Sequence, residues 1–579
     1  MLTMRAYSDV LLTHPLVAAG PIPSAQDPDG VYPYEHYAET SRRPILQAYR
    51  FVTMENDRVQ ATICPDLGGK VYSLIHKASC KETLFTIPAV RPVRILPRQF
   101  FVGGGIEVSF PISHSPVQIV PVHCRTAETE ERLFVWCGER EIRFGMQWTV
   151  EYSLGKDDCF LTQRTYFHNP TSEPHPWMSW SNAGVPARAD SEFWFPNGPV
   201  LEHGDDMKTI DWATQGPARQ ADIRRMNGYF WRAPDSQAFG VYTPSLGSGL
   251  FHVADQRLTP GMKLWSDGIG KHEAWVDQYT LNGEQCLEIQ AGPIVDQSIK
   301  NELAPGAGHV HLEFWIPTDR RLDIYALTVP DVELPDVKQI PLFGFARSEE
   351  TELWERVVEA CRRQSAELLP PPPGLDDNRW AITGCEELEE ALRYAAASKP
   401  EEASVWRMQL GTWYAGRDRI EEAIAELEAS GEDRAWALAA RLYRRNKGDP
   451  RRAAECYRNI RSRALALHPQ VIVERDLALS GIGPETWAER EYWLSQTSAL
   501  QDEWLAERRA AWLADTGRYE EAKRLLEQTA FQLVHQRYAR TKLWRRIMKG
   551  LGEPVREAPA SLGEDDLFVF GAYREYQED

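Results

Sequence analysis

The sequence predicts a chain of two structural parts, a large antiparallel β-sandwich followed by an all-α domain of helical repeats. Residues 48–330 alternate short β-branched and aromatic runs with turn signals. Residues 379–552 are rich in Ala, Leu, Arg and Glu, and their apolar residues recur at helical spacing. The total length of 579 residues also exceeds what a single core of ordinary size accommodates. We therefore expect a multidomain β plus α protein.

The β part is predicted from segments that combine strand composition with nearby turns. Residues 59–64, 146–152 and 310–316 have the β-branched and aromatic character of strands. Between such runs lie turn sequences that contain Gly together with Asp or Asn, as at residues 66–69 and 281–284. Many strands without intervening helices predict a large sandwich or barrel. Residues 1–47 are interpreted as an extension that precedes it.

A change of composition separates the two parts. Residues 331–378 contain several prolines around one short helical stretch, and we interpret them as a linker that packs along the sandwich. Residues 553–579 form an acidic C-terminal tail with one apolar run.

The α part carries its own motif. The segments Leu410-Gly-Thr-Trp-Tyr-Ala-Gly-Arg417 and Trp512-Leu-Ala-Asp-Thr-Gly-Arg-Tyr-Glu-Glu-Ala522 resemble tetratricopeptide repeats. Small residues in such repeats allow paired helices to approach closely. The resemblance implies an array of helical hairpins that serves assembly, for which a homodimer is one expectation.

Composition limits the function classes. A formal net charge of -19 argues against nucleic acid and anionic membranes as partners. Nine scattered cysteines without a CxxC pair indicate reduced thiols, and no apolar run approaches the length of a membrane span. We therefore expect a cytoplasmic protein. We expect no cofactor and assign no metal ligands, since HExxH, GxSxG and a phosphate-binding glycine loop are missing. Bound Ca²⁺ stays an alternative, because ligands from scattered loops leave no linear motif.

Two carboxylates are candidates for catalysis. Glu107 lies in Gly103-Gly-Gly-Ile-Glu-Val-Ser-Phe-Pro, and Glu288 lies in Cys286-Leu-Glu-Ile-Gln-Ala-Gly. Both are placed inside apolar, strand-like runs, where a carboxylate either finds a partner or has its pKa raised. A pair of such groups is typical of acid/base chemistry on sugars. The predicted ligand is therefore a mono- or oligosaccharide.

These motifs also carry a resemblance. Residues 63–74, Gly104-Gly-Ile-Glu-Val-Ser-Phe-Pro111 and Leu287-Glu-Ile-Gln290 resemble segments of the galactose-mutarotase-like supersandwich of the aldose 1-epimerase superfamily. The resemblance implies that Glu288 is the general base. The stretch that supplies a catalytic histidine in those enzymes has Trp180, Ser181 and Asn182 here, and His175 comes earlier.

Further residues are candidates for binding the sugar. Aromatic rings stack on sugar faces and side-chain amides pair with hydroxyl groups. Each residue also has an ordinary structural interpretation, such as a core histidine or a solvated charge. The candidates for substrate binding are His114, Trp180, Asn182, His252, Lys263 and Trp265.

Three functional hypotheses remain open from the sequence. The first is a glycoside hydrolase or related glycosyl-processing enzyme that uses Glu107 and Glu288 as acid/base or nucleophile partners. The second is an aldose 1-epimerase-type mutarotase with Glu288 as base and His114 or another histidine as acid. The third is a non-catalytic sugar-binding module whose repeats contact a protein partner.

Overall fold

The computed structural model describes most of the chain. It covers residues 2–562 except 19, 23–24, 28–29, 33–36, 42, 87–88, 97–98, 113, 115, 204–206, 225, 270–283, 298, 345–348, 375–376, 378, 501, 532–536 and 555–557. Most of the predicted acidic tail, 553–579, lies outside these residues. No helix in the described part is long and apolar enough to cross a membrane.

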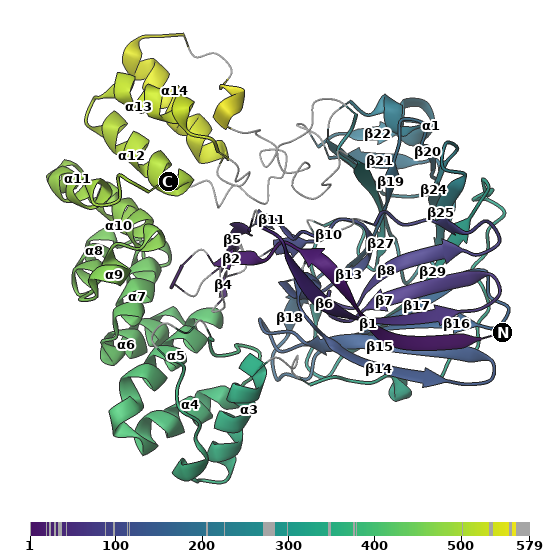
Figure 1. Cartoon of the computed structure of the whole chain (residues 1–579), viewed down its shortest axis with the longest axis horizontal. Coiled ribbons are helices and arrows are strands. Elements are labelled where there is room, and N and C mark those ends of the chain that lie inside the picture. Colours follow the sequence, from purple (N-terminus) through teal and green to yellow (C-terminus); the bar gives the residue numbers. More distant parts are fainter. Residues whose placement is uncertain are drawn as a thin grey trace. The chain divides into compact units, whose positions relative to one another are not determined.

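The chain divides into two compact units (Figure 1). The first, called here the β unit, comprises Met1–Leu16 and Thr40–Ser348. The second, the helical unit, comprises Val17–Glu39 and Glu349–Asp579. The chain therefore crosses between the units three times, at 16–17, 39–40 and 348–349. A β-rich part followed by helical repeats confirms the predicted fold class.

The larger sheet of the β unit is antiparallel except where β1 pairs with β10. Its spatial order is β10 (Ala89–Val90), β1 (Thr3–Thr13), β6 (Ile45–Glu55), β7 (Val59–Cys64), β8 (Lys70–His76), β13 (Gly105–Ser109), β19 (Trp180–Ala187), β27 (Gln285–Gly292), β26 (Gly261–Ser266), β23 (Asn227–Trp231), β21 (Pro199–Glu202) and β22 (Thr209–Asp211), with β9 (Lys81–Glu82) beside β8.

The second sheet of the β unit is fully antiparallel in its described pairings. Its order is β14 (His123–Glu128), β15 (Arg132–Arg140), β16 (Gln147–Gly155), β17 (Leu161–His168), β29 (Gly308–Thr318), β25 (Ser248–Ala254), β24 (Ala238–Thr243) and β20 (Glu192–Trp194). Smaller pairs join β11 (Val93–Leu96) to β12 (Gln99–Phe101) and β18 (His175–Trp177) to β28 (Asn301–Leu303).

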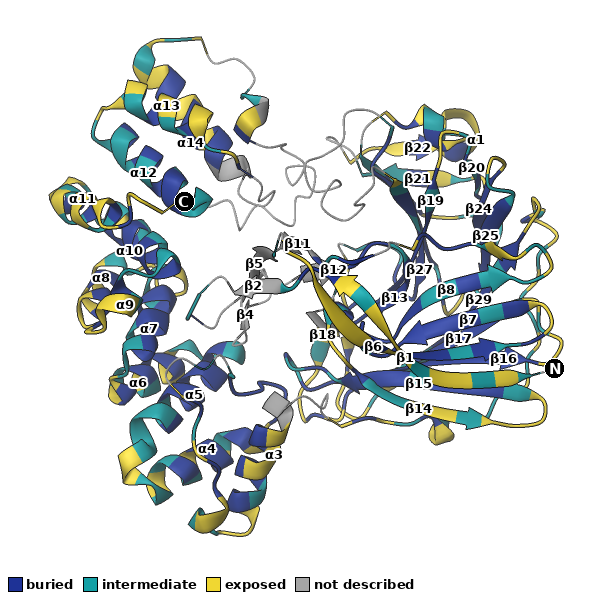
Figure 2. Cartoon of the chain, viewed as in Figure 1, coloured by how far each residue is buried: buried dark blue, intermediate teal, exposed yellow. Residues whose placement is uncertain are grey.

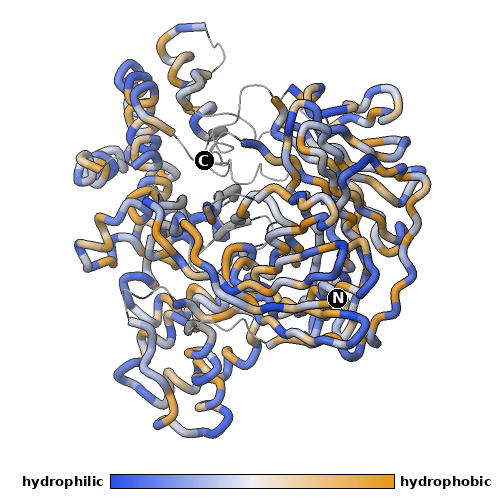
Figure 3. The backbone as a smooth tube through the Cα atoms, turned by 45° about the vertical axis from the view of Figure 1, so that its right-hand side comes forward, coloured by the Kyte–Doolittle hydropathy of each residue, from blue (hydrophilic) through white to orange (hydrophobic). Residues whose placement is uncertain are grey.

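The hydrophobic core lies between the two sheets. Inward-facing side chains of both sheets form one buried cluster, which includes Val71, Ile106, Ile289, Val135 and Trp148. Burial is nearly continuous along β16 and β17, whereas β1 is largely exposed (Figure 2). Hydrophobic and hydrophilic residues alternate along the tube through the sheets, as expected for strands with only one face in the core (Figure 3). The predicted β-sandwich is therefore present.

The N-terminal residues differ from the predicted extension 1–47. Strand β1 pairs with β6 along its whole length, from Thr3 opposite Glu55 to Thr13 opposite Ile45, so it belongs to the sandwich. Residues 17–39 belong to the helical unit. Residues 16–40 include β2 (Leu16–Ala18), β3 (Ala25–Asp27), β4 (Gly30–Tyr32) and β5 (Tyr37–Thr40). Composition did not indicate β1, because its polar residues look like those of a loop.

The proline-rich segment, 331–378, belongs to the β unit up to Ser348 and to the helical unit from Glu349. Its first part lies on the second sheet, where Thr149 donates a hydrogen bond to the Pro341 carbonyl (2.6 Å) and Gln147 donates one to the Phe343 carbonyl (2.9 Å). Helix α3 (Glu349–Arg362) then begins the main part of the helical unit.

The helical unit is a series of helices that pack against their neighbours in sequence. After α3 they are α4 (Glu387–Ser398), α5 (Ala403–Gly416), α6 (Ile420–Ser430), α7 (Asp433–Arg445), α8 (Pro450–Arg458), α9 (Arg463–Ala466), α10 (Pro469–Ile482), α11 (Trp487–Ser495), α12 (Glu503–Asp515), α13 (Tyr519–Gln528) and α14 (Arg537–Leu551). In the α5–α6 hairpin, a Cβ on Gly411 would lie 2.6 Å from Leu427. This close approach is the reason for the small residue there.

Candidate functional site

Both predicted carboxylates lie on one face of the larger sheet, the face opposite the core. Strands β13, β19, β27 and β26 are neighbours in this sheet. Directly opposite one another across these four strands lie, in order, Glu107, Asn182, Gln290 and Lys263. One two-residue step along the strands, Gly184 pairs with Glu288, which pairs with Trp265. Residues two apart in a strand share a face, so these two rows form one surface, called here the site face.

Along each strand, residues of the site face alternate with residues of the core, and this alternation fixes the register. Ile106, Ala183, Ile289 and Leu264 lie between the site residues in sequence, and all four are in the core cluster. A shift of one residue in register would bring the site carboxylates into the core, so burial of these apolar residues fixes the register.

Register also sets the spacing of Glu107 and Glu288. They are two strands and one two-residue step apart, which for ideal strands separates their Cα atoms by about 12 Å. The negative charges of both residues act on Lys70 and on His114. The two carboxylates therefore flank the same cationic groups, as a shared site requires.

Glu107 is a buried carboxylate with several partners. Its Oε1 lies 2.7 Å from Nδ1 of His114, and it accepts a hydrogen bond from the Asn182 side chain. Burial would raise the pKa of Glu107, but the charge and hydrogen bond of His114, the charge of Lys70 and the bond from Asn182 lower it overall. Glu107 is thus held in its ionised form.

His114 is the group of this pair that carries the proton. Its backbone φ of +48° lies in the left-handed region, which side chains other than glycine rarely adopt. Burial would lower the pKa of the imidazole, but the charge and hydrogen bond of Glu107 and the charge of Glu288 raise it overall. His114 is only partly buried, so a protonated imidazole can meet a ligand.

Glu288 is the more accessible carboxylate. It is partly exposed, and one carboxylate oxygen accepts a hydrogen bond of 2.9 Å from Nε2 of Gln290. Gln290 continues the network, because its Oε1 accepts a hydrogen bond of 3.3 Å from Nε2 of Gln297. The Gln290 amide therefore lies beside Glu288, and the Gln297 amide follows it in the network, as further polar groups for a hydroxyl-rich ligand.

Lys263 and Trp265 lie at the other side of Glu288. The Lys263 ammonium donates a hydrogen bond of 2.8 Å to Gln297, and it lies 4.9 Å from the ring centroid of Trp265. Burial lowers the pKa of Lys263 to about 8, and the charges of Glu288 and Asp296 oppose that shift. Trp265 is partly exposed, and its ring covers Gly228, where a Cβ would lie 2.6 Å from the ring.

Asn182 has an acceptor available for a ligand. It is 7% exposed, and its Oδ1 has no hydrogen-bond partner among the described residues. A buried amide oxygen without a partner costs free energy, and a hydroxyl group of a bound sugar would satisfy it.

Trp180 shares the site face but is covered. It is 1% exposed and packs on Phe230 with ring centroids 6.0 Å apart. Gly261 gives its ring space, since a Cβ there would lie 2.9 Å from the indole. Trp180 is therefore a buried side chain on the site face near Asn182, and it has no exposed ring face for stacking.

His252 does not belong to the site face. It lies on β25 of the second sheet, and its Nε2 is 3.2 Å from Glu313 in the sandwich interior. Ser181 and Gln163 bind the same Glu313 carboxylate from the two sheets, at 2.6 and 2.8 Å. Strands β25 and β26 follow each other in sequence but lie in different sheets, so the core position that the sequence left as the alternative for His252 is the one observed.

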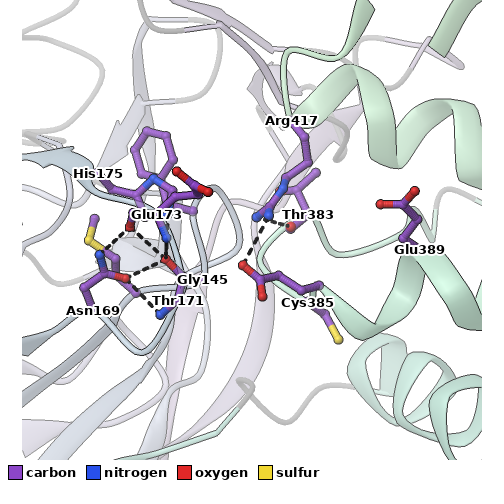
Figure 4. A network of polar contacts seen from close by, with 12 residues as sticks. Gly145, Asn169, Thr171, Glu173, His175, Thr383, Cys385, Glu389 and Arg417 are labelled. Carbon is purple, nitrogen blue, oxygen red and sulfur yellow. Dashed lines mark hydrogen bonds and ion pairs between the residues drawn. The ribbon is translucent and has the colours of Figure 1, made fainter. Parts of the chain in front are cut away.

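His175 has a structural role in the turn after β17. Asn169 donates hydrogen bonds to the carbonyls of Glu173 (2.7 Å) and Leu303 (2.8 Å), and Thr171 joins Asn169 to the His175 ring, 2.9 Å from its Nε2 (Figure 4). The same ring stacks on Phe144 with centroids 4.8 Å apart. These contacts explain the Asn-containing turn without a role in catalysis.

Lys70, Gln290 and Gln297 were not predicted from the sequence. Lys70 is fully embedded next to β13, and its ammonium donates to the Val102 and Gly104 carbonyls, the latter at 2.7 Å. Gln290 was detectable, because it lies two residues after Glu288 and so on the same face. Lys70 and Gln297 come from segments whose position depends on the fold. No described group of three or more His, Cys, Asp or Glu side chains is placed to hold a metal.

Comparison with known proteins places this architecture in a family. A model described as a domain of unknown function, DUF5107, matches residues 26–318, which is half of the chain. The chain belongs to the DUF5107 family. The DUF5107 match contains the whole site face, and a second model, described as a C-terminal domain, matches residues 354–547.

Solved structures extend this assignment. A TPR-domain containing protein from Parabacteroides distasonis is 49% identical, with a TM-score of 0.94 over 97% of this chain and 98% of that chain. Two further solved structures match at low identity. A putative mutarotase from Salmonella typhimurium matches at 10% identity and a TM-score of 0.37, over 53% of this chain and 97% of that chain. A putative aldose 1-epimerase from Escherichia coli K12 matches at 10% identity and a TM-score of 0.34, over 46% and 97%.

Proposed function

We propose that this protein catalyses proton transfer at the anomeric centre of a sugar, with Glu288 as the general base and His114 as the general acid. The observation that carries the proposal is the contrast between Glu107, whose carboxylate is bound by His114 and Asn182, and Glu288, which is partly exposed. One group holds a proton donor in place, and the other is accessible to take up a proton.

The reaction that suits this arrangement is the interconversion of anomers. Glu288 would accept the proton of the anomeric hydroxyl while the His114 imidazolium donates a proton to the ring oxygen, which opens the ring. Rotation about the bond to the anomeric carbon and closure with the reverse proton transfers would give the other anomer. Trp265 offers a ring face for stacking, and the unpaired Oδ1 of Asn182 would accept from a hydroxyl group.

The charge state of Glu107 argues against its use as the acid of a glycoside hydrolase. Such an acid must carry a proton, and therefore requires a raised pKa. The pKa of Glu107 is lowered by His114, Lys70 and Asn182. In our proposal Glu107 is a positioning residue that keeps His114 protonated and correctly oriented.

The test is proton NMR of a panel of freshly dissolved aldoses and disaccharides, with the anomeric signals followed in time. We expect the native protein to accelerate anomer exchange, and Glu288→Gln and His114→Asn each to reduce the rate at least about a hundredfold. The control is Glu302→Gln, an exposed glutamate on β28.

Two outcomes would contradict the proposal. New anomeric signals from cleaved disaccharides, lost in Glu288→Gln, would show a glycoside hydrolase. Saturable binding of a sugar without exchange or cleavage would show a binding module.

A further inference from the structure

The helical unit holds a short piece of the N-terminal segment in a buried position. Ile22 is 0% exposed, although it is separated from the helices by more than three hundred residues of sequence. Gly20 lies directly against α10, because a Cβ there would be 2.4 Å from Oε1 of Gln470 and 2.6 Å from the ring of His468. The segment 20–22 therefore fits closely against this part of the helical unit.

Two nearly buried side chains bind the backbone of this segment. Gln470 is 3% exposed, and its Oε1 accepts a hydrogen bond of 3.0 Å from the Ile22 N–H. Arg434 is 5% exposed, and its Nε donates a hydrogen bond of 3.0 Å to the Pro21 carbonyl. Contacts to the backbone together with one buried side chain are the usual means of binding an extended peptide.

Arg434 is held in place by the helical unit itself. Its Nη1 donates a hydrogen bond of 2.6 Å to the Asp377 carbonyl, and its guanidinium lies 4.3 Å from the ring centroid of Trp380. A donor held in this way loses little rotamer freedom when a peptide binds.

Only one of the two polar groups of the Gln470 side chain is bonded to the segment. Its Nε2 is buried and has no hydrogen-bond partner among the described residues. A glutamine side chain presents one acceptor and one donor group, which match the N–H and C=O of an extended peptide. The site therefore has one donor more than the Gly20-Pro21-Ile22 segment uses.

We propose that Arg434, Gln470 and His468 form a peptide-binding site, which Gly20-Pro21-Ile22 of the same chain fills in cis. The ligand class is an extended peptide with glycine two residues before an aliphatic side chain. Such a peptide from another protein binds when the chain's own segment leaves. The attached segment competes at a high effective concentration, so the site is closed in the native protein.

The test uses the full-length chain and a fluorescein-labelled synthetic peptide with the sequence of residues 16–27. Ile22→Glu unseats the attached segment, because it would bury an unpaired charge. Gly20→Ala is a second way to unseat it, because the Cβ collides with Gln470 at a φ of +151°. Fluorescence anisotropy measures binding, and circular dichroism checks that each variant is folded.

We expect both variants to bind the peptide saturably and the native protein to bind it at least tenfold more weakly. Gln470→Met in the Gly20→Ala background should remove the binding, and a peptide with the Ile22→Glu change should not bind. Equal binding to native protein and variants, or no binding to folded variants, would overturn the proposal.

Discussion

Glu107 and Glu288 show how two identical residues acquire different properties on one sheet face. Glu107 is 3% exposed and lies between His114, Asn182 and Lys70, whereas Glu288 is partly exposed and bound by Gln290. The electrostatic neighbours, and not the residue type, distinguish the positioning carboxylate from the accessible one.

Replacement of Glu107 should change how the rate of anomer exchange depends on pH. His114 must be protonated to act as an acid, so activity falls as the pH rises through its pKa. Because the charge of Glu107 raises that pKa, Glu107→Gln should move the alkaline limb of the rate profile to lower pH. The measurement is the rate of anomer exchange between pH 5 and 9.

Glu302→Gln serves as the control for this prediction. It removes an exposed carboxylate on β28 and should leave the alkaline limb where it is in the native protein. An alkaline limb that stays where it is in Glu107→Gln would show that His114 is not the titrating acid.

At the scale of elements, the site depends on a close contact between the turn before β13 and strand β19. A Cβ on Gly184 would lie 2.5 Å from the Cα of Gly104, so the backbones touch where no side chain fits. Gly104 and Gly105 have φ values of +77° and +68°, which directs β13 into the sheet with Glu107 on the site face.

Gly184→Ala should therefore damage both stability and activity. The added methyl group collides with backbone atoms, and we expect it to lower the free energy of unfolding by about 1–3 kcal/mol. Because the turn positions Glu107, the rate of anomer exchange should fall as well. Urea unfolding and the NMR assay measure the two effects.

The matched control is Gly344→Ala, since a Cβ there would meet nothing within 4 Å. It should leave both quantities close to native. Native-like stability and activity of Gly184→Ala would show that the turn moves away without consequence for the site.

At the scale of the whole molecule, three chain crossings connect the two units. Residues 17–39 leave the β unit, join the helical unit through Ile22 and the backbone of Pro21, and return to the β unit. The proline-rich segment provides the later crossing at 348–349. The chain between β1 and β6 therefore supplies a loop that is part of the helical unit.

Cleavage of the later crossing should leave the two fragments together. A site for a sequence-specific protease inserted after Gly344 would give fragments 1–344 and 345–579. Residues 17–39 stay with the first fragment but pack in the helical unit, so we expect the fragments to elute together on size exclusion. Addition of the Ile22→Glu change should weaken this association, and separate elution of the cleaved native sequence would contradict the expectation.

The order of parts and the two carboxylates were predictable from the sequence. Strand-like runs with turns, and later apolar residues at helical spacing, depend on local patterns that survive in any context. Glu107 and Glu288 were detectable because a charged residue inside an apolar run is conspicuous. The two-residue alternation of a strand then placed each of them opposite the core.

Only the tertiary structure decided which residues meet. Strand order brings β13, β19, β27 and β26 together from across the β unit, which adds Lys70 and Gln297 to the site face and leaves His252 in the core. It also assigns β1 to the sandwich and residues 17–39 to the helical unit. The physical reason is that local propensity is a property of neighbouring residues, whereas sheet order and docking follow from burial summed over the whole chain.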